Sequence, residues 1–439
     1  MENRRSDKWA ALIDRLFNHD AWADYQAMHW CDRLRVKSEF PGRLWPNAVQ
    51  AYHGWLVDAC RDNLPLDRLA RELLTASGSN FRAAPVNFYR AIPRREPAAI
   101  TESVVLTFLG VRPEHLPAAR RDGMAPCFSR IGFKETAEWK EEIVFFDRAK
   151  AEAAGPPPAA VFPDGKRVPL DPARDPREIF ADWLTAPDNR DFARCLVNRI
   201  WFDLLGRGIV HEPDDLRPDN PPSNPALLDF LAGELASHHF DARHVMRLIL
   251  NSETYQRSAI PLDANRADVA HFSHYPVRRL DAEVLIDAIN QVTGTRETYS
   301  SEIPEPFTYI PPSHRAAALG DGSITSPFLD MFGRPPRDTG LVSERSNEVS
   351  DTQILHLLNS THIQQKIESG PAIQALQNSK KEVPTLIDEI YLSLLSRHPS
   401  DEDRTTAVAH FKDGGRKRHE AVNDLVWALL NSREFLFRH

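Results

Sequence analysis

The feature that most constrains this chain is the helical spacing of its apolar residues, which recurs from one end to the other. Near the N-terminus, Trp9, Leu12, Ile13 and Leu16 follow the i, i+3, i+4, i+7 pattern of one helix face. Similar segments fill most of the sequence, and one of them is stopped by Gly110. The sequence therefore predicts a mainly α, multi-helical protein.

Two helical blocks are predicted, at 1–150 and 177–439, joined by a proline-rich linker at 151–176. Within the linker, "VFPDGKRV" can form a small hairpin around Asp164–Gly165, which is the most β structure that we expect. From about 295 to 345 the helical spacing fades into an irregular connection, which is either functional or wraps the surface. A C-terminal helical segment follows it.

Polar caps mark several helix starts in the second block. Asp188 or Asn189 can cap one helix, and Asp241 can cap another. Asn224 followed by Pro225 is a third start signal, because proline suits the first helical position. These residues predict three helices within about 190–250.

Composition excludes several classes of protein. The chain has 439 residues and a net charge of −8, and it lacks a basic stripe interleaved with aromatic residues, so we do not expect nucleic-acid binding. No apolar run approaches the roughly 18 residues of a membrane span. The opening "MENRRSDKWAALIDRLF" is no secretory signal, so the chain as written is expected in the cytoplasm. It would be periplasmic or exported if the true start lies upstream.

The cysteines and serines give no sign of cofactor or nucleophilic chemistry. Cys31, Cys60, Cys127 and Cys195 stand singly, and no C-x-x-C pair is present for zinc, redox or haem chemistry. No G-x-S-x-G sequence marks a nucleophilic serine. We therefore expect buried free thiols, no covalent haem and no resident cofactor.

The stretch "NRIWFDLLGRGIVHEPDDLRP", residues 198–218, contains a Gly-Arg-Gly that resembles an anion-binding loop. A phosphate loop needs its glycines ahead of a helix, where N–H groups point at the anion. Here Gly206 and Gly208 follow a helix, and Gly206 suits the left-handed position that ends one. We interpret these glycines as a helix stop.

The same stretch holds the best candidate for a metal site. His211, Glu212, Asp214 and Asp215 offer four nitrogen or oxygen ligands within five residues, and hard cations accept clustered carboxylates. Adjacent residues of an extended chain point to opposite sides, however, so the acids can instead pair with nearby arginines. The candidate partners are Arg199, Arg207 and Arg217. A divalent metal stays an open, less favoured alternative.

Arginines supply the candidate binding residues. Arg279 and Glu283 in "RRLDAE" are spaced one helical turn apart, which suits an ion pair. "FGRPPRDTG" places Arg334 and Arg337 in a rigid turn, where guanidinium groups can hold carboxylate or sulfate or can brace the loop. With Arg199, these four residues form the predicted binding set.

The sequence resembles the planctomycete cytochrome C domain-containing proteins, which join domains of unknown function 1549 and 1553. The first domain, of which 1–150 resembles the C-terminal part, is echoed by "LIDRLFNHDAWADYQAMHWCDRLR", "NFYR" and "FLGVR". The second, resembled by 177–439, is echoed by "NRIWFDLLGRGIVHEPDDLRP", "RRLDAEVLIDAI", "FGRPPR", "LHLLNS" and "WALLNSREFL". Family members commonly carry a C-x-x-C-H haem motif after "FLGVR", but here only Cys127 lies nearby. The resemblance thus implies a haem-less, truncated member of a typically exported family.

Three hypotheses for the function follow. We favour a non-catalytic binding or scaffold protein that partners a protein or a polyanionic glycan, with the link to polysaccharide breakdown that the family implies. The first alternative is a metal-assisted hydrolase that uses His211, Asp214 and Asp215. The second is a degenerate redox protein that docks a cytochrome partner.

Overall fold

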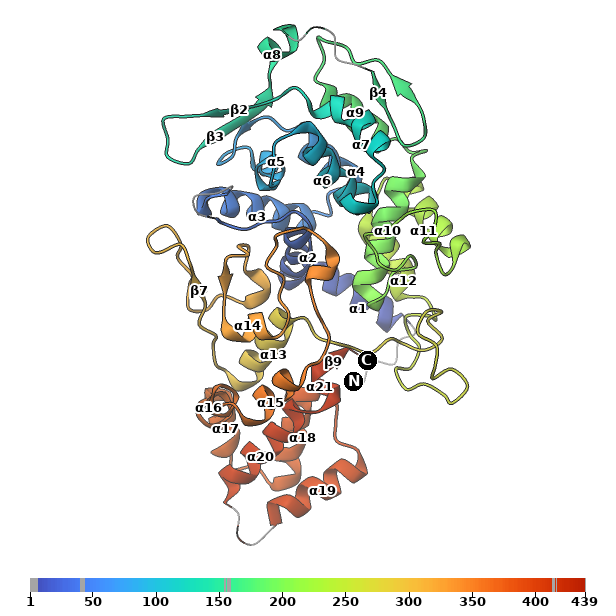
Figure 1. Ribbon diagram of the computed structural model, residues 1–439. Helices are drawn as coiled ribbons and strands as arrows, with labels where there is room; N and C mark the ends of the chain where they lie inside the picture. Colours follow the sequence, from blue (N-terminus) through green and yellow to red (C-terminus); the bar gives the residue numbers. More distant parts are fainter. Residues whose placement is uncertain are drawn as a thin grey trace.

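The protein is mainly α-helical, as predicted, and its helices are arranged in one elongated body in the computed structural model (Figure 1). The structure describes residues 7–39, 44–153, 155, 159–412, 415 and 417–438. The C-terminal strand lies near the middle of the long axis, close to the first helix. Segments from both ends of the sequence therefore meet at the centre.

The first part of the chain contributes the upper end of the body in Figure 1 and the helices just below it. Its helices are α1 (Lys8–Phe17), α2 (Asp20–Arg33), α3 (Pro46–Arg61), α4 (Leu66–Thr75), α5 (Asn87–Ala91), α6 (Pro97–Leu109), α7 (Ala118–Met124) and α8 (Arg148–Ala153). The predicted face of α1 is only partly buried. Ile13 and Phe17 enter the core, whereas Leu16 is exposed and the Trp9 indole N–H bonds the carbonyl of Leu250.

A three-stranded antiparallel sheet in this part was not predicted. It has the order β1 (Gly78–Ser79), β3 (Glu142–Phe146) and β2 (Ile131–Glu135). The strands are short, and β1 and β3 lie more than 60 residues apart in the sequence. A pairing of this kind is hard to predict from the local sequence, because the strand propensity of a residue depends on the neighbours that the fold places around it.

The predicted linker is folded against the core. Its hairpin is confirmed as β4 (Ala160–Val161) paired with β5 (Arg167–Val168). Phe162, at the end of β4, stacks on Trp183 and contacts the buried Phe180 in α9 (Pro176–Leu184).

Three helices follow α9, each with the predicted cap. They are α10 (Arg190–Leu205), α11 (Pro225–Ser237) and α12 (Ala242–Leu250). The side chains of Asn189, Asn224 and Asp241 accept backbone N–H bonds at their starts. Gly206 ends α10 with φ +77°, so the helix-stop interpretation of this glycine is confirmed.

The remaining chain forms the lower end of the body. It begins with β6 (Arg278–Arg279) and α13 (Ala282–Thr293). The irregular connection holds β7 (Ser300–Ser301), β8 (Ile324–Thr325), α14 (Pro327–Met331) and two short 3-10 helices at Ala316–Ala318 and Val342–Glu344. The last elements are α15 (Asp351–Asn359), α16 (Thr361–Ser369), α17 (Pro371–Gln377), α18 (Val383–Leu395), α19 (Asp401–Lys412), α20 (Arg418–Leu430), α21 (Arg433–Leu436) and β9 (Phe437–Arg438). Strand β9 pairs with β6 and so returns the chain end to the centre.

Two buried apolar clusters form the core. The first contains residues from Ile13 to Tyr275, and the second contains residues from Ala282 to Phe435. The two clusters of buried apolar residues are divided between Tyr275 and Ala282, and the two predicted helical blocks are divided at 151–176. Ala160, Phe162 and Leu170 of the predicted linker belong to the first cluster.

The aromatic contact between the linker and α9 yields a stability prediction. Replacing Phe180, which is fully buried, by alanine should lower the free energy of unfolding by about 3–5 kcal/mol, because it removes a large side chain and leaves a cavity. Urea unfolding measures this change. Phe230→Ala is the control, since Phe230 is 54% exposed and its loss should cost under about 0.5 kcal/mol. Equal costs for the two variants would contradict the packing described.

Candidate functional site

The carboxylate of Asp32, near the end of α2, is buried. It accepts hydrogen bonds from two arginines that lie more than 300 residues later in the sequence. Arg337 donates from Nε to Asp32 Oδ1 at 2.8 Å. Arg345 donates from Nη2 to Asp32 Oδ2 at 2.8 Å and from Nε at 3.1 Å. Burial alone would raise the pKa of Asp32, but the charges of Arg345 and Arg337 outweigh it and hold that pKa below its usual value. The Asp32 carboxylate is therefore ionised, and both of its oxygens accept hydrogen bonds from arginine.

Glu283 in α13 extends this cluster. It accepts from Arg345 Nη1 at 2.6 Å and lies 3.4 Å from Arg334 Nε. The predicted helical pair of Arg279 with Glu283 is absent from the described ion pairs, because Arg279 belongs to β6 and precedes the helix. Arg279 instead donates to the carbonyls of Phe332 and Ser346. We call Asp32, Glu283, Arg334, Arg337 and Arg345 the central charge cluster.

The backbone of the "FGRPPR" turn places Arg334 and Arg337 in the central charge cluster. Gly333 has φ +81°, and a Cβ there would lie 2.2 Å from the carbonyl oxygen of Ser346, so only glycine fits. Arg337 itself has φ +62°, an uncommon value for a residue with a side chain. Its guanidinium also donates to the carbonyls of Val36 and Gly320, which hold it in place.

A second group of polar and charged residues surrounds Asp281 and adjoins the central charge cluster. This carboxylate accepts from Tyr25, Asn347 and Arg438, so it joins α2 to the C-terminal strand. Burial opposes its charge, but Arg438 and Arg345 hold the pKa of Asp281 well below the usual range. The cavity between the two groups measures about 20 Å³, which is room for one water molecule and not for a sulfate or carboxylate ligand. The geometry here suits bracing of the fold.

Arg199, the fifth predicted binding residue, lies elsewhere and pairs with Asp214. Both side chains are buried, and Nη2 of Arg199 lies 2.7 Å from Asp214 Oδ1. The same guanidinium donates to the carbonyls of Leu106 and Thr107 in α6. The other oxygen of Asp214 accepts from the backbone N–H of Val342 at 2.6 Å. Asp214 thus ties α10 and α6 to the connection that carries Arg345.

The neighbouring Asp215 faces a different set of partners. Its carboxylate lies 2.7 Å from Nδ1 of His115 and 3.0 Å from Nε of Arg217. Glu212 lies 3.5 Å from Arg112 and 3.4 Å from His211. Within the part of the chain that the structure describes, no three of the four predicted metal ligands come within 4.8 Å of one another. The arrangement matches acids that are paired with nearby arginine and histidine side chains.

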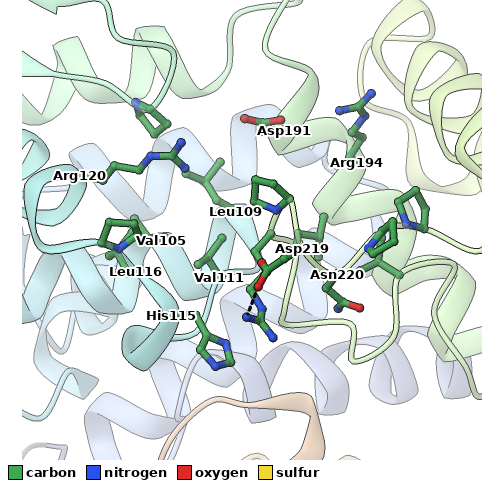
Figure 2. A pocket seen from close by; sticks show the side chains of 18 of the residues that line it. Val105, Leu109, Val111, His115, Leu116, Arg120, Asp191, Arg194, Asp219 and Asn220 are labelled. Carbon is green, nitrogen blue, oxygen red and sulfur yellow. Dashed lines mark hydrogen bonds and ion pairs between the residues drawn. The ribbon is translucent and has the colours of Figure 1, made fainter.

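His115 and Arg217 lie at the edge of the main cavity, which measures about 790 Å³ (Figure 2). This volume is within the range of ligand-binding pockets. In Figure 2, Val105, Leu109 and Val111 form the wall between His115 below and Arg120 and Asp191 above. The other lining residues are mostly proline and aliphatic: Leu116, Pro117, Met124, Pro163, Val210, Leu216, Pro218, Pro221, Pro222, Pro225 and Leu228.

Most charges around this cavity pair with one another. Arg194 lies 2.5 Å from Asp229, and Arg217 lies 2.8 Å from Asp219. Among the described lining residues, none carries a hydroxyl or a thiol. His115 is held by a carboxylate as a general base would be, yet no side-chain nucleophile of the serine or cysteine type stands beside it. The cavity is therefore lined mainly by apolar side chains and by charged groups that are mostly paired.

The sequence matches two known protein families. Residues 176–411 match the family described as protein of unknown function DUF1553 (PSD1), which is more than half of the sequence. The chain belongs to the DUF1553 family. Residues 1–112 match a second family, protein of unknown function DUF1549 (PSCyt2), as the resemblance predicted. A search of curated proteins and of solved structures gave no match.

Both family matches contribute residues to the main cavity, and His115, Leu116, Pro117, Arg120, Met124 and Pro163 come from the segment between them. Val105, Leu109 and Val111 come from the DUF1549 part, and Asp191 to Asp229 come from the DUF1553 part. Among the described residues, no helix has both the length and the apolar character needed to cross a membrane.

Sequence reasoning missed Asp32, Arg345, Asp281 and His115. Arg345 lies eight residues after "FGRPPR", but Asp32 and Asp281 stand within the family motifs "WCDRLR" and "RRLDAEV", and His115 lies three residues after "FLGVR". That position was the available signal. Their partners lie 62 to 313 residues away, at distances that no local spacing reveals.

A histidine beside the central charge cluster predicts that the stability of the fold depends on pH. Burial lowers the pKa of His53 to about 4, and the nearby charge of Arg337 adds to this effect. Because the folded pKa lies below the unfolded value of about 6.5, stability from the neutral imidazole is present above pH 6.5 and is lost toward pH 4. The urea midpoint of the protein should fall between pH 7 and pH 5, and His53→Gln should reduce that fall. Exposed His398→Gln is the control, and an unchanged fall in His53→Gln would contradict the prediction.

Proposed function

We propose that the protein is a non-catalytic binding module that takes a segment of a partner protein into the main cavity. The observation that carries this proposal is the cavity itself: a large, mostly apolar hollow at the junction of the two family segments. Rigid walls favour binding, since less conformational entropy is lost when a ligand enters a preformed site. Six lining prolines supply that rigidity: Pro117, Pro163, Pro218, Pro221, Pro222 and Pro225.

The charges around the cavity favour a peptide over a polyanionic glycan. A polyanion is attracted by rows of cations of one sign. Here Arg194 and Arg217 already pair with Asp229 and Asp219. An apolar side chain can enter the hollow as an anchor, as in the buried centres of protein interfaces. Exposed Arg120 and Asp191 at the rim then suit flanking groups of opposite sign.

The hydrolase alternative has less support. A metal-assisted mechanism needs ligand atoms with open coordination. Asp214 already accepts from Arg199 and from the N–H of Val342, and Asp215 contacts His115 and Arg217. We therefore favour binding without catalysis, and the metal role of His211, Asp214 and Asp215 stays the weaker hypothesis.

Selection of a random peptide library on the immobilised full chain tests the proposal. We expect enriched peptides with an apolar anchor, whose binding weakens at least about tenfold in Leu116→Trp, because the indole fills the cavity. Leu262→Trp is the matched control, since Leu262 is 72% exposed and lies outside the cavity.

Heparin at physiological salt is the opposing probe in the same assay. The proposal expects no heparin binding that depends on the cavity. Binding of heparin that Leu116→Trp abolishes, or peptides that bind both tryptophan variants equally, would contradict it.

A further inference from the structure

A cluster of two histidines and a glutamate lies at the corner between α11 and α12, away from the main cavity. Glu234 lies in the last turn of α11, His238 is the residue that caps the end of α11, and His244 stands in the first turn of α12. One ligand atom from each side chain lies within 4.8 Å of the other two. None of these residues lines the main cavity or belongs to the central charge cluster.

We propose that Glu234, His238 and His244 form a binding site for a divalent cation of the zinc class. Two imidazoles and one carboxylate are the ligand types that zinc accepts in three-ligand sites, with water in the fourth position. Calcium and magnesium prefer six or more oxygen ligands, so this donor set does not suit them. Cobalt and nickel favour the same nitrogen donors and serve as probes.

The distances agree with this coordination. Glu234 Oε2 lies 2.9 Å from Nε2 of His244 and 3.6 Å from Nδ1 of His238. Ligand atoms about 2.0–2.1 Å from a tetrahedral zinc lie roughly 3.4 Å apart, so the two values bracket the required separation. The cation would replace the hydrogen bond between His244 Nε2 and Glu234 Oε2, and the bonds of His238 Nδ1 with the carbonyl of Glu234 and with Ser237.

The two imidazole rings are stacked, with centroids 3.6 Å apart and planes 15° apart. Two protonated rings at this distance would repel each other, and metal binding requires both rings to be neutral. Because imidazole nitrogen lone pairs lie in the ring planes, both nitrogens can bind one cation only when the exposed His238 ring turns out of this stack.

The corner that carries the ligands is fixed by its surroundings. Asn63 donates to the Asp241 carboxylate at 2.7 Å, and Leu66 N–H bonds the carbonyl of Phe240. Arg243 donates to the carbonyls of Cys60 and Arg61. The three side chains thus stand on a rigid frame, and a bound cation would join the end of α11 to the start of α12.

Calorimetric titration of the metal-free full chain with zinc chloride tests the site. We expect one equivalent of zinc to bind, with the dissociation constant raised more than 100-fold in His244→Ala and in His238→Ala, since even outer-shell losses cost roughly 10- to 100-fold. His239→Asn is the matched control, because His239 is exposed, lies outside the ligand set and has a left-handed φ that asparagine tolerates.

Cobalt absorption in the visible range gives a second readout. An intense ligand-field band in the wild type and in His239→Asn, and its loss in His238→Ala, would support the site. Wild-type zinc affinity in both alanine variants, or equal loss in His239→Asn, would overturn it. His238 is exposed, so His238→Ala keeps the test decisive even where His244→Ala perturbs folding.

Discussion

The shared carboxylate of Asp32 is the interaction on which the centre of this molecule depends. It lies in α2, near the start of the chain, yet its partners Arg337 and Arg345 are more than 300 residues away. Taking three charges out of water costs several kcal/mol per ion, and only good geometry and further hydrogen bonds offset it. Here the offsetting bonds come from Glu283 and from backbone carbonyls around the "FGRPPR" turn. The long irregular connection therefore has a definite place against α2.

The same anchoring reaches the walls of the main cavity. Val342, three residues before Arg345, donates to Asp214, and Asp214 holds Arg199. Arg199 in turn binds carbonyls at the end of α6, the helix that supplies Val105 and Leu109 to the cavity. The DUF1549 and DUF1553 segments are thus joined through one continuous series of buried polar contacts. In our proposal, this series is what keeps the cavity preformed for a partner segment.

Local sequence patterns predicted where several helices begin and end, whereas the partners of the buried charged residues depend on contacts between distant parts of the sequence. The caps at Asn224 and Asp241 and the stop at Gly206 depend on a few neighbouring residues, so they can be predicted from sequence. The bracing role considered for Arg334 and Arg337 agrees with their burial, but their acceptors could not be foreseen. The spacing of Arg279 and Glu283 suggested a pair on one helix, but Arg279 lies in β6, ahead of the helix that carries Glu283.

The central claim is that Asp32 and Arg337 are energetically coupled across the molecule. A double-mutant cycle with Asp32→Asn and Arg337→Met, measured by urea unfolding, tests it most directly. We expect a coupling energy of about 2 kcal/mol or more, because each single change leaves an uncompensated buried charge or dipole. The exposed pair of Lys37 and Asp338 should give a coupling below about 1 kcal/mol in the same experiment. A coupling near zero between Asp32 and Arg337 would contradict the claim.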